Sequence, residues 1–250
     1  MKSCLANPPP DCRDESLVTG ATDHGTDRAT AVFVGPSLHG VDGLPVGNEW
    51  SFHPPARSGD LIAAAKRGAS RIVLIDGVFI ESLPPTPGEI LRLLRNGIDV
   101  IGAASLGALR AVELEPFGMI GIGWVYRQFR SARLFADDEV MVVYDAQANR
   151  PLSEALVNLR YALMRCGKWL PAGCPRRILA RIGDLYFPER TRHRIAQAVT
   201  AEAGPAIAER FMRAYPGLNI KTADALDAMA MRSAVFSKRE CTRPAVGWCA

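Results

Sequence analysis

The feature that most constrains the fold is the stretch 100–114, where an apolar run enters a turn of small residues and the turn opens a helix. A strand followed at once by a helix is the unit from which α/β sheets are built. Gly102 and Gly107 have no side chains, so one backbone segment can approach another closely and space remains for a ligand. Ser105 lies at the helix start, beside amide N–H groups that have no partner within the helix. The stretch therefore predicts a strand–turn–helix unit that can hold an anion.

Two further apolar runs, 31–34 and 71–75, are short and continuous, which is typical of strands buried on both faces of a parallel sheet. Helical patterns at 60–66 and 89–95 separate these runs from each other and from a third strand at 99–101. The alternation of strand and helix predicts an α/β fold with a doubly wound, Rossmann-like parallel sheet. A mostly α-helical C-terminal extension follows it.

A polar residue follows each of these three strands. Ser37 follows the first strand, Asp76 the second and Ser105 the third. Because ligands of doubly wound sheets bind at the carboxyl ends of the strands, we expect the three side chains to line one cleft. We also expect the apolar segment 140–144 to form an edge strand.

Composition divides the chain into four parts. They are a variable or disordered leader at 1–29, an α/β core at 30–150, a helical extension at 151–240 and a tail at 241–250. Residues 1–150 carry 14 Lys and Arg against 18 Asp and Glu, whereas residues 151–250 carry 16 against 8. The basic second half indicates an acidic protein partner. Its Arg residues are scattered without interleaved aromatic residues, which does not favour nucleic acid.

Several classes of function find no support in the sequence. The six cysteines contain no C-x-x-C pair, so we expect no metal site. Residues 1–10 lack the apolar segment of a signal peptide, and no run approaches the roughly 20 apolar residues of a membrane span. We expect a cytoplasmic protein that binds no cofactor, membrane or nucleic acid. The oligomeric state is left open.

The motifs of the first half occur in a specific order. They are Gly35-Pro36-Ser37-Leu38, Pro54-Pro55-Ala56, Gly59-Asp60, Ile75-Asp76-Gly77-Val78-Phe79, Glu89-Ile90-Leu91, the stretch 102–114, Phe117-Gly118-Met119-Ile120-Gly121 and Asp137-Asp138-Glu139-Val140. In order and spacing they resemble the TfuA-like proteins over about residues 32–145. The resemblance implies a partner of a YcaO enzyme in backbone thioamidation of a ribosomal peptide or protein. It further implies sulfur delivery, by hydrolysis of a thiocarboxylate on a ubiquitin-like sulfur-carrier protein.

The chain departs from that family at one segment. The family often has Trp-His-Lys ahead of Glu-Ile-Leu, whereas this chain has Thr86, Pro87 and Gly88. A histidine base cannot come from this segment. Either the chain uses another group or it is altered in activity.

For hydrolysis we expect Ser105 as the nucleophile, with amides of the 105–108 helix start stabilising the oxyanion. The geometry is that of the strand–Ser–helix elbow of serine hydrolases, although Ala103 replaces the first glycine of that motif. Asp76 and Glu89 are the acidic candidates for the base. Each residue has a structural alternative: a helix N-cap for Ser105, a local turn for Asp76 and a favourable helix-dipole interaction for Glu89.

Five residues are candidates for substrate binding: Ser37, Gly102, Gly107, Arg110 and Glu113. Arg110 could hold a carboxylate with two hydrogen bonds, or form a surface ion pair with Glu113 three residues later.

Two other functions are compatible with the sequence. One is a non-catalytic adaptor that binds and stimulates YcaO or recruits the sulfur carrier. The other is a nucleotide- or phosphate-binding module, which ranks last because the chain lacks both G-x-G-x-x-G and the P-loop Gly-Lys-Ser/Thr.

Overall fold

The computed structural model describes residues 29–79, 82–148 and 150–231. The predicted leader, apart from Ala29, and the predicted tail at 241–250 lie outside the described residues.

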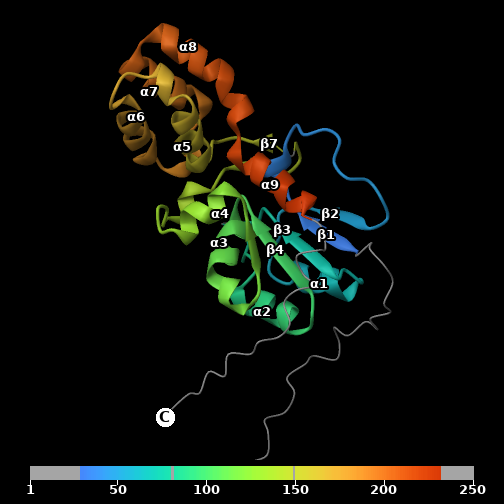
Figure 1. The fold of residues 1–250 in the computed structure, drawn as a ribbon. Coiled ribbons are helices and arrows are strands. Elements are labelled where there is room, and N and C mark those ends of the chain that lie inside the picture. Colours follow the sequence, from blue (N-terminus) through green and yellow to red (C-terminus); the bar gives the residue numbers. More distant parts are fainter. Residues whose placement is uncertain (1–28, 80–81, 149, 232–250) are drawn as a thin grey trace, which may run out of the picture.

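Among the described residues, the central sheet has five parallel strands in the order β2-β1-β3-β4-β5 (Figure 1). The strands are β1 (Thr30–Phe33), β2 (Trp50–His53), β3 (Arg71–Leu74), β4 (Asp99–Ala103) and β5 (Ile120–Ile122). The predicted α/β class with a doubly wound parallel sheet and a C-terminal helical region is confirmed. The sequence analysis missed β2 and β5, which form the two edges. Neither edge strand contains a buried residue. An edge strand therefore does not need the continuous apolar run that is typical of a central strand, and the sequence pattern does not reveal it.

Alternate strand residues point to opposite faces of the sheet. One face packs against α1 (Asp60–Lys66), α2 (Pro87–Arg95) and α3 (Leu106–Leu114). Phe33 and Leu74 belong to that face, whereas Val32 and Val73 point to the other. The second face packs against α9 (Ile220–Ala230), which Figure 1 shows lying across the sheet on the side away from α2. A helix from the end of the described chain therefore completes the core.

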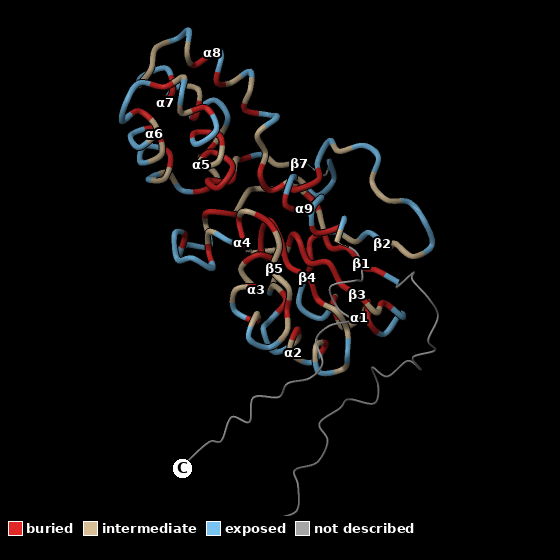
Figure 2. The backbone as a smooth tube through the Cα atoms, viewed as in Figure 1, coloured by how far each residue is buried: buried red, intermediate tan, exposed pale blue. Residues whose placement is uncertain are grey.

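The remaining helices form a second cluster with its own apolar core. Its members are α5 (Leu156–Arg165), α6 (Cys174–Gly183), α7 (Arg192–Ala203) and α8 (Pro205–Ala214). Figure 2 shows buried residues both in the sheet and inside this helical cluster. Helix α4 (Gly123–Arg130) packs against both α3 and α9. Short 3-10 helices complete the described structure: η2 (Pro36–Leu38), η3 (Glu115–Phe117), η4 (Asp137–Glu139), η5 (Gly167–Trp169), η6 (Phe187–Glu189) and η7 (Tyr215–Leu218).

A buried carboxylate fixes α9 to the rest of the core. Both oxygens of Asp224 accept hydrogen bonds of 2.7 Å from the first amides of α4, those of Trp124 and Val125. A side chain at Gly123, where φ is +96°, would place its Cβ 2.2 Å from the Asp224 carboxyl carbon. Burial raises the pKa of Asp224 from 3.8 to about 6, although the two amide hydrogen bonds oppose this shift.

The predicted edge strand at 140–144 is wrong for most of its length. Only Tyr144 is in a strand, β6 (Tyr144–Asp145), which pairs antiparallel with β7 (Arg150–Pro151) outside the central sheet. Residues 140–143 instead run past the end of the sheet, where Val140 is buried and its carbonyl accepts a hydrogen bond from Lys221. The apolar side chains on which the strand prediction rested instead form part of a cavity wall.

Candidate functional site

The site is organised around Asp76, which follows β3 at the carboxyl end of the sheet. One oxygen of Asp76 accepts hydrogen bonds of 3.0 Å from the amides of Gly35 and Ser37, which follow the neighbouring strand β1. The other oxygen accepts a bond of 2.7 Å from the Ser37 hydroxyl. The chain leaves β1 toward one edge of the sheet and β3 toward the other, so this is the crevice where doubly wound sheets bind ligands. The Asp76 carboxylate therefore accepts hydrogen bonds from Gly35 and Ser37, not from a local turn with Gly77.

Lys221, at the start of α9, completes this group and was missed by the sequence analysis. Its Nζ lies 3.7 Å from an Asp76 oxygen and donates a 2.9 Å hydrogen bond to the Val140 carbonyl. The side chain is buried, and burial lowers the pKa of Lys221 while Asp76 opposes the shift. The Thr222 hydroxyl next to it donates to the Ser37 carbonyl at 2.7 Å, which fixes the helix start over the crevice.

Ser105 lies at the N-cap of α3, but its side chain makes no capping hydrogen bond. Ala104 before it has φ of +63°, a left-handed conformation that costs a non-glycine residue roughly 1–2 kcal/mol. The Ser105 hydroxyl has no hydrogen-bond partner among the described residues. A strained turn that presents an unpaired hydroxyl is a recurrent feature of functional sites.

Of the four amides at 105–108 that we expect to stabilise an oxyanion, three already donate hydrogen bonds within the protein. The amides of Ser105, Gly107 and Ala108 donate to the carbonyls of Ala103, Ile75 and Ser105, at 2.7, 3.1 and 3.0 Å respectively. Among the described residues, no acceptor faces the Leu106 amide.

A cavity of about 510 Å³ opens over this edge of the sheet. Its wall contains six polar or charged side chains, those of Arg57, Asp60, Asp76, Ser105, Tyr144 and Lys221. Most of the remaining wall is apolar and includes Pro36, Pro54, Pro55, Val78, Phe79, Val140, Met141, Val142, Val143 and Phe187. An apolar cavity with a few convergent polar groups is the usual form of a small-molecule or peptide-tail site.

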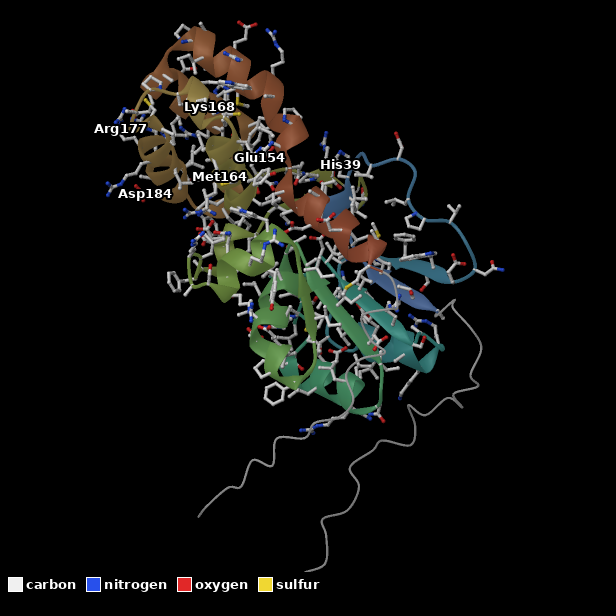
Figure 3. All side chains as sticks on the ribbon, in the orientation of Figure 1. His39, Glu154, Met164, Lys168, Arg177 and Asp184 are labelled. Atoms are coloured by element: carbon white, nitrogen blue, oxygen red, sulfur yellow. The ribbon has the colours of Figure 1, made fainter. Side chains whose placement is uncertain are left out.

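Ser37 lines a second, smaller cavity of about 200 Å³, whose wall also includes Lys221. His39 and Glu154 belong to this wall, and Figure 3 shows both close to the start of α9. Burial raises the pKa of Glu154, although Arg192 and the Tyr215 hydroxyl oppose the shift. Lys221 therefore borders both cavities. Of the three residues expected to line one cleft, Asp76 and Ser105 line the larger cavity, whereas Ser37 lines the smaller one and contacts Asp76 by its hydrogen bond.

Close packing of the backbone explains why positions 102 and 107 are glycine. A Cβ on Gly107 would lie 1.8 Å from the carbonyl oxygen of Leu74, and one on Gly102 would lie 2.0 Å from that of Gly107. The absence of side chains lets α3 rest directly on β3 and β4. Neither glycine is part of the wall of the large cavity.

The other three candidates lie away from the cavity wall. Arg110 donates to both Glu113 oxygens, at 2.9 and 2.7 Å, and to the Pro85 carbonyl at 2.9 Å. The Glu89 carboxylate accepts from the amides of Gly59 and Ile62, at 3.1 and 3.4 Å, and so caps the start of α1. A binding or catalytic role for these residues stays a prediction.

Two further findings concern the described residues. They contain no group of three or more His, Cys, Asp or Glu side chains placed to hold a metal ion. Their helices are all too short or too polar to reach across a lipid bilayer.

Comparison with known proteins adds one match. Residues 76–191 match the family model described as TfuA-like protein. The matched region begins at Asp76 and includes Ser105, but it ends before Lys221. A search of curated proteins found none that matches the chain.

Proposed function

Because the chain is a TfuA-like protein over residues 76–191, we propose that it hydrolyses a thiocarboxylated sulfur-carrier protein and so supplies sulfide to a YcaO enzyme. The family links the chain in general terms to the YcaO-associated thioamidation system. The hydrolysis, the ubiquitin-like carrier and the YcaO partner are the specific parts of the proposal.

The observation that carries the proposal is the unpaired Ser105 hydroxyl at a strained strand-to-helix turn in the cavity wall. The hydroxyl oxygen attacks the thioacid carbonyl carbon and forms a C–O bond. The C–S bond then breaks with its electron pair on sulfur, which leaves as HS⁻ with the hydroxyl proton. Water hydrolyses the serine ester and releases the carrier with a carboxylate end.

The Leu106 amide is the donor available to the oxyanion of this reaction. One preorganised donor of this kind contributes on the order of 3 kcal/mol to the stability of the transition state. A thioacid is ionised at neutral pH, and its sulfur can accept the proton during expulsion, so the reaction demands less of a dedicated base than amide hydrolysis does.

The segment that replaces Trp-His-Lys has a structural role instead of a catalytic one in this proposal. The Thr86 hydroxyl caps α2 by accepting from the Glu89 amide, and Pro87 lies in the first turn. Proline suits that position because its missing N–H has no partner in a helix start.

Purified protein incubated with a thiocarboxylated carrier tests the proposal, with released sulfide and carrier mass as the readouts. We expect sulfide release together with a carrier mass change from thiocarboxylate to carboxylate. Ser105→Ala should abolish both, and Ser131→Ala, at an exposed serine, should leave both unchanged. Stimulation of YcaO without sulfide release would favour the adaptor instead.

The exposed surface of the helical cluster is the proposed docking face for an acidic partner. Its exposed basic residues include Arg165, Lys168, Arg176, Arg194 and Arg210. Figure 3 shows Lys168 on this cluster, far from the cavity end of α9. Association with the carrier or with YcaO should weaken as salt rises, because salt screens exposed charges. An affinity that is independent of salt would contradict this assignment.

A further inference from the structure

We infer that the smaller cavity, of about 200 Å³, is a separate binding site for a small molecule with one carboxylate group. Asn158, Ser153 and Arg192 supply the hydrogen-bond donors for that group. The inference goes beyond the proposed function and does not depend on it, because it concerns a different cavity from the one that Ser105 lines.

The smaller cavity lies where three separate parts of the chain meet. They are the turn after β1, the segment that leads into α5, and the segment that joins α8 to α9. Figure 3 shows His39 of the first part and Glu154 of the second near the start of α9. Ser105 does not belong to this wall, whereas Lys221 belongs to the walls of both cavities. A ligand in the smaller cavity therefore lies beside the proposed hydrolytic site without occupying it.

Asn158, in the first turn of α5, carries the inference, because its side-chain amine is buried without a partner. Only 7% of the residue is exposed. Its Oδ1 accepts a 3.2 Å hydrogen bond from the Lys221 amide, and because an amide N–H only donates, this contact fixes which end of the side chain is the amine. Among the described residues, Nδ2 has no acceptor, and it is not sealed from solvent. Buried polar groups are nearly always paired, so this amine in the cavity wall indicates an acceptor that enters the cavity.

Ser153 supplies a second donor in the same wall. The residue is 3% exposed, and its hydroxyl oxygen accepts a 2.8 Å hydrogen bond from the Val143 amide. The hydroxyl hydrogen has no acceptor among the described residues. The wall therefore offers buried N–H and O–H donors in excess of its acceptors, which suits a ligand with acceptor oxygens.

The charges of the wall favour a monoanion. Its cationic side chains are Lys221 and Arg192, and its carboxylate is Glu154. Both Glu154 oxygens are engaged, since one accepts from the Tyr215 hydroxyl at 3.3 Å and the other lies 3.5 Å from Arg192 Nε. The Nη atoms of Arg192 have no partner among the described residues, and a guanidinium can bind a carboxylate with two hydrogen bonds. Because Asp76 lies beside Lys221, little positive charge is left over, which suits one carboxylate and does not suit a phosphate or sulfate dianion.

The volume of the cavity limits the size of the ligand. A cavity of roughly 150 Å³ can hold benzene, so one of about 200 Å³ holds a ligand of up to about ten non-hydrogen atoms. Apolar side chains can contact a short hydrocarbon part of such a ligand; they belong to Pro36, Val142, Pro151, Ala155 and Pro216. The ligand class is therefore a short-chain monocarboxylate.

Butyrate is the probe for this site, and saturation-transfer NMR on the 250-residue chain measures its binding without any enzymatic assay. We expect butyrate to bind with a dissociation constant below about 10 mM. Butyramide has the same shape without the charge, and it should bind at least about tenfold more weakly. Inorganic phosphate at matched ionic strength should not displace butyrate.

Four variants locate the bound carboxylate. Asn158→Asp keeps an oxygen for the Lys221 amide but replaces the N–H donors by an oxygen that repels a carboxylate. It should weaken butyrate binding at least about tenfold, and so should Arg192→Gln at the exposed rim. Arg194→Gln, exposed but outside the cavity wall, should leave the affinity unchanged. Ser105→Ala should also leave it unchanged, because Ser105 lines only the larger cavity.

The inference is overturned if wild type shows no saturation transfer to butyrate at about 10 mM. It is also overturned if affinity is equal in wild type and in either donor variant, Asn158→Asp or Arg192→Gln, once denaturant unfolding shows that variant to be folded. Loss of binding in Ser105→Ala with retention in Arg192→Gln would move the carboxylate to the larger cavity. Equal competition by phosphate would show that the wall selects charge alone. None of these measurements uses the carrier, so failure of the site and failure of the proposed hydrolysis are distinguishable.

Discussion

The two faces of the central sheet are covered in different ways. Helices α1–α3 come from the same part of the chain as the strands, and they seal one face with apolar side chains and with the Gly102–Gly107 contact. Helix α9 covers the other face from far along the chain, and it brings two buried charged residues, Lys221 and Asp224. The difference shows that α1–α3 cover their face by apolar packing, whereas α9 also brings buried polar side chains, one of which, Lys221, lines the large cavity.

The largest effect is expected on the face covered by α1–α3. Gly107→Ala places a Cβ 1.8 Å from the Leu74 carbonyl oxygen, and backbone cannot give way as a flexible side chain can. We expect a loss of at least about 3 kcal/mol of unfolding free energy, or failure to fold. Gly217→Ala is the matched control, since its Cβ meets nothing within 4 Å. Denaturant unfolding measures both, and equal stability of the two variants would contradict the close contact.

Next in size is the loss of the carboxylate that joins the two faces. Asp76→Ala leaves Lys221 buried without its partner and frees the amides of Gly35 and Ser37. Removing one member of a buried pair costs about 3–5 kcal/mol. Glu113→Ala, which breaks a partly exposed pair, should cost less than about 1 kcal/mol. A similar loss in both variants, measured by urea unfolding, would show that Asp76 is not the anchor.

The same contrast explains what the sequence could predict. The central strands and their helices follow local patterns, and the residues that end β1, β3 and β4 do meet at one edge. Lys221 carries no local signal, because it lies outside the recognised motifs and only tertiary packing brings it to Asp76. The apolar run at 140–144 was wrongly predicted to be a strand, because the wall of an apolar cavity and a buried strand are both rich in the same apolar residues. The sequence around Glu89 does not reveal that its oxygens accept hydrogen bonds from the amides of Gly59 and Ile62, because that contact depends on how α2 packs beside α1.

The α9 face should also respond to pH. The pKa of Asp224 is raised from 3.8 to about 6, so ionising it costs more in the folded state than in the unfolded state. The contribution of the protonated Asp224 carboxyl to the unfolding free energy is fully present below about pH 4. It is lost as pH rises through about 6, an effect on the order of 2–3 kcal/mol. Asp224→Asn removes the titration. Unfolding free energies from pH 4 to 7 should fall in wild type relative to the variant, and parallel curves would contradict the shift.

The smallest effect is expected at Glu89. Glu89→Ala removes the acceptor for the Gly59 and Ile62 amides, and the loss of a helix cap costs about 0.5–2 kcal/mol. Because Glu89 is not part of the cavity wall, sulfide release should stay within about twofold of wild type once the protein is folded. A loss of turnover in a fully folded variant would instead support the predicted catalytic role of Glu89.

The proposed hydrolysis requires that Ser105, at the edge of the sheet beside the start of α9, forms a covalent intermediate with the carrier. The direct measurement is rapid quenching of the protein with a thiocarboxylated carrier, followed by mass analysis of the intact protein and of its peptides. We expect a carrier-linked species that forms at the rate of sulfide release, maps to Ser105 and is absent from Ser105→Ala. Sulfide release by a folded Ser105→Ala variant at the wild-type rate, with no linked species in either protein, would contradict it.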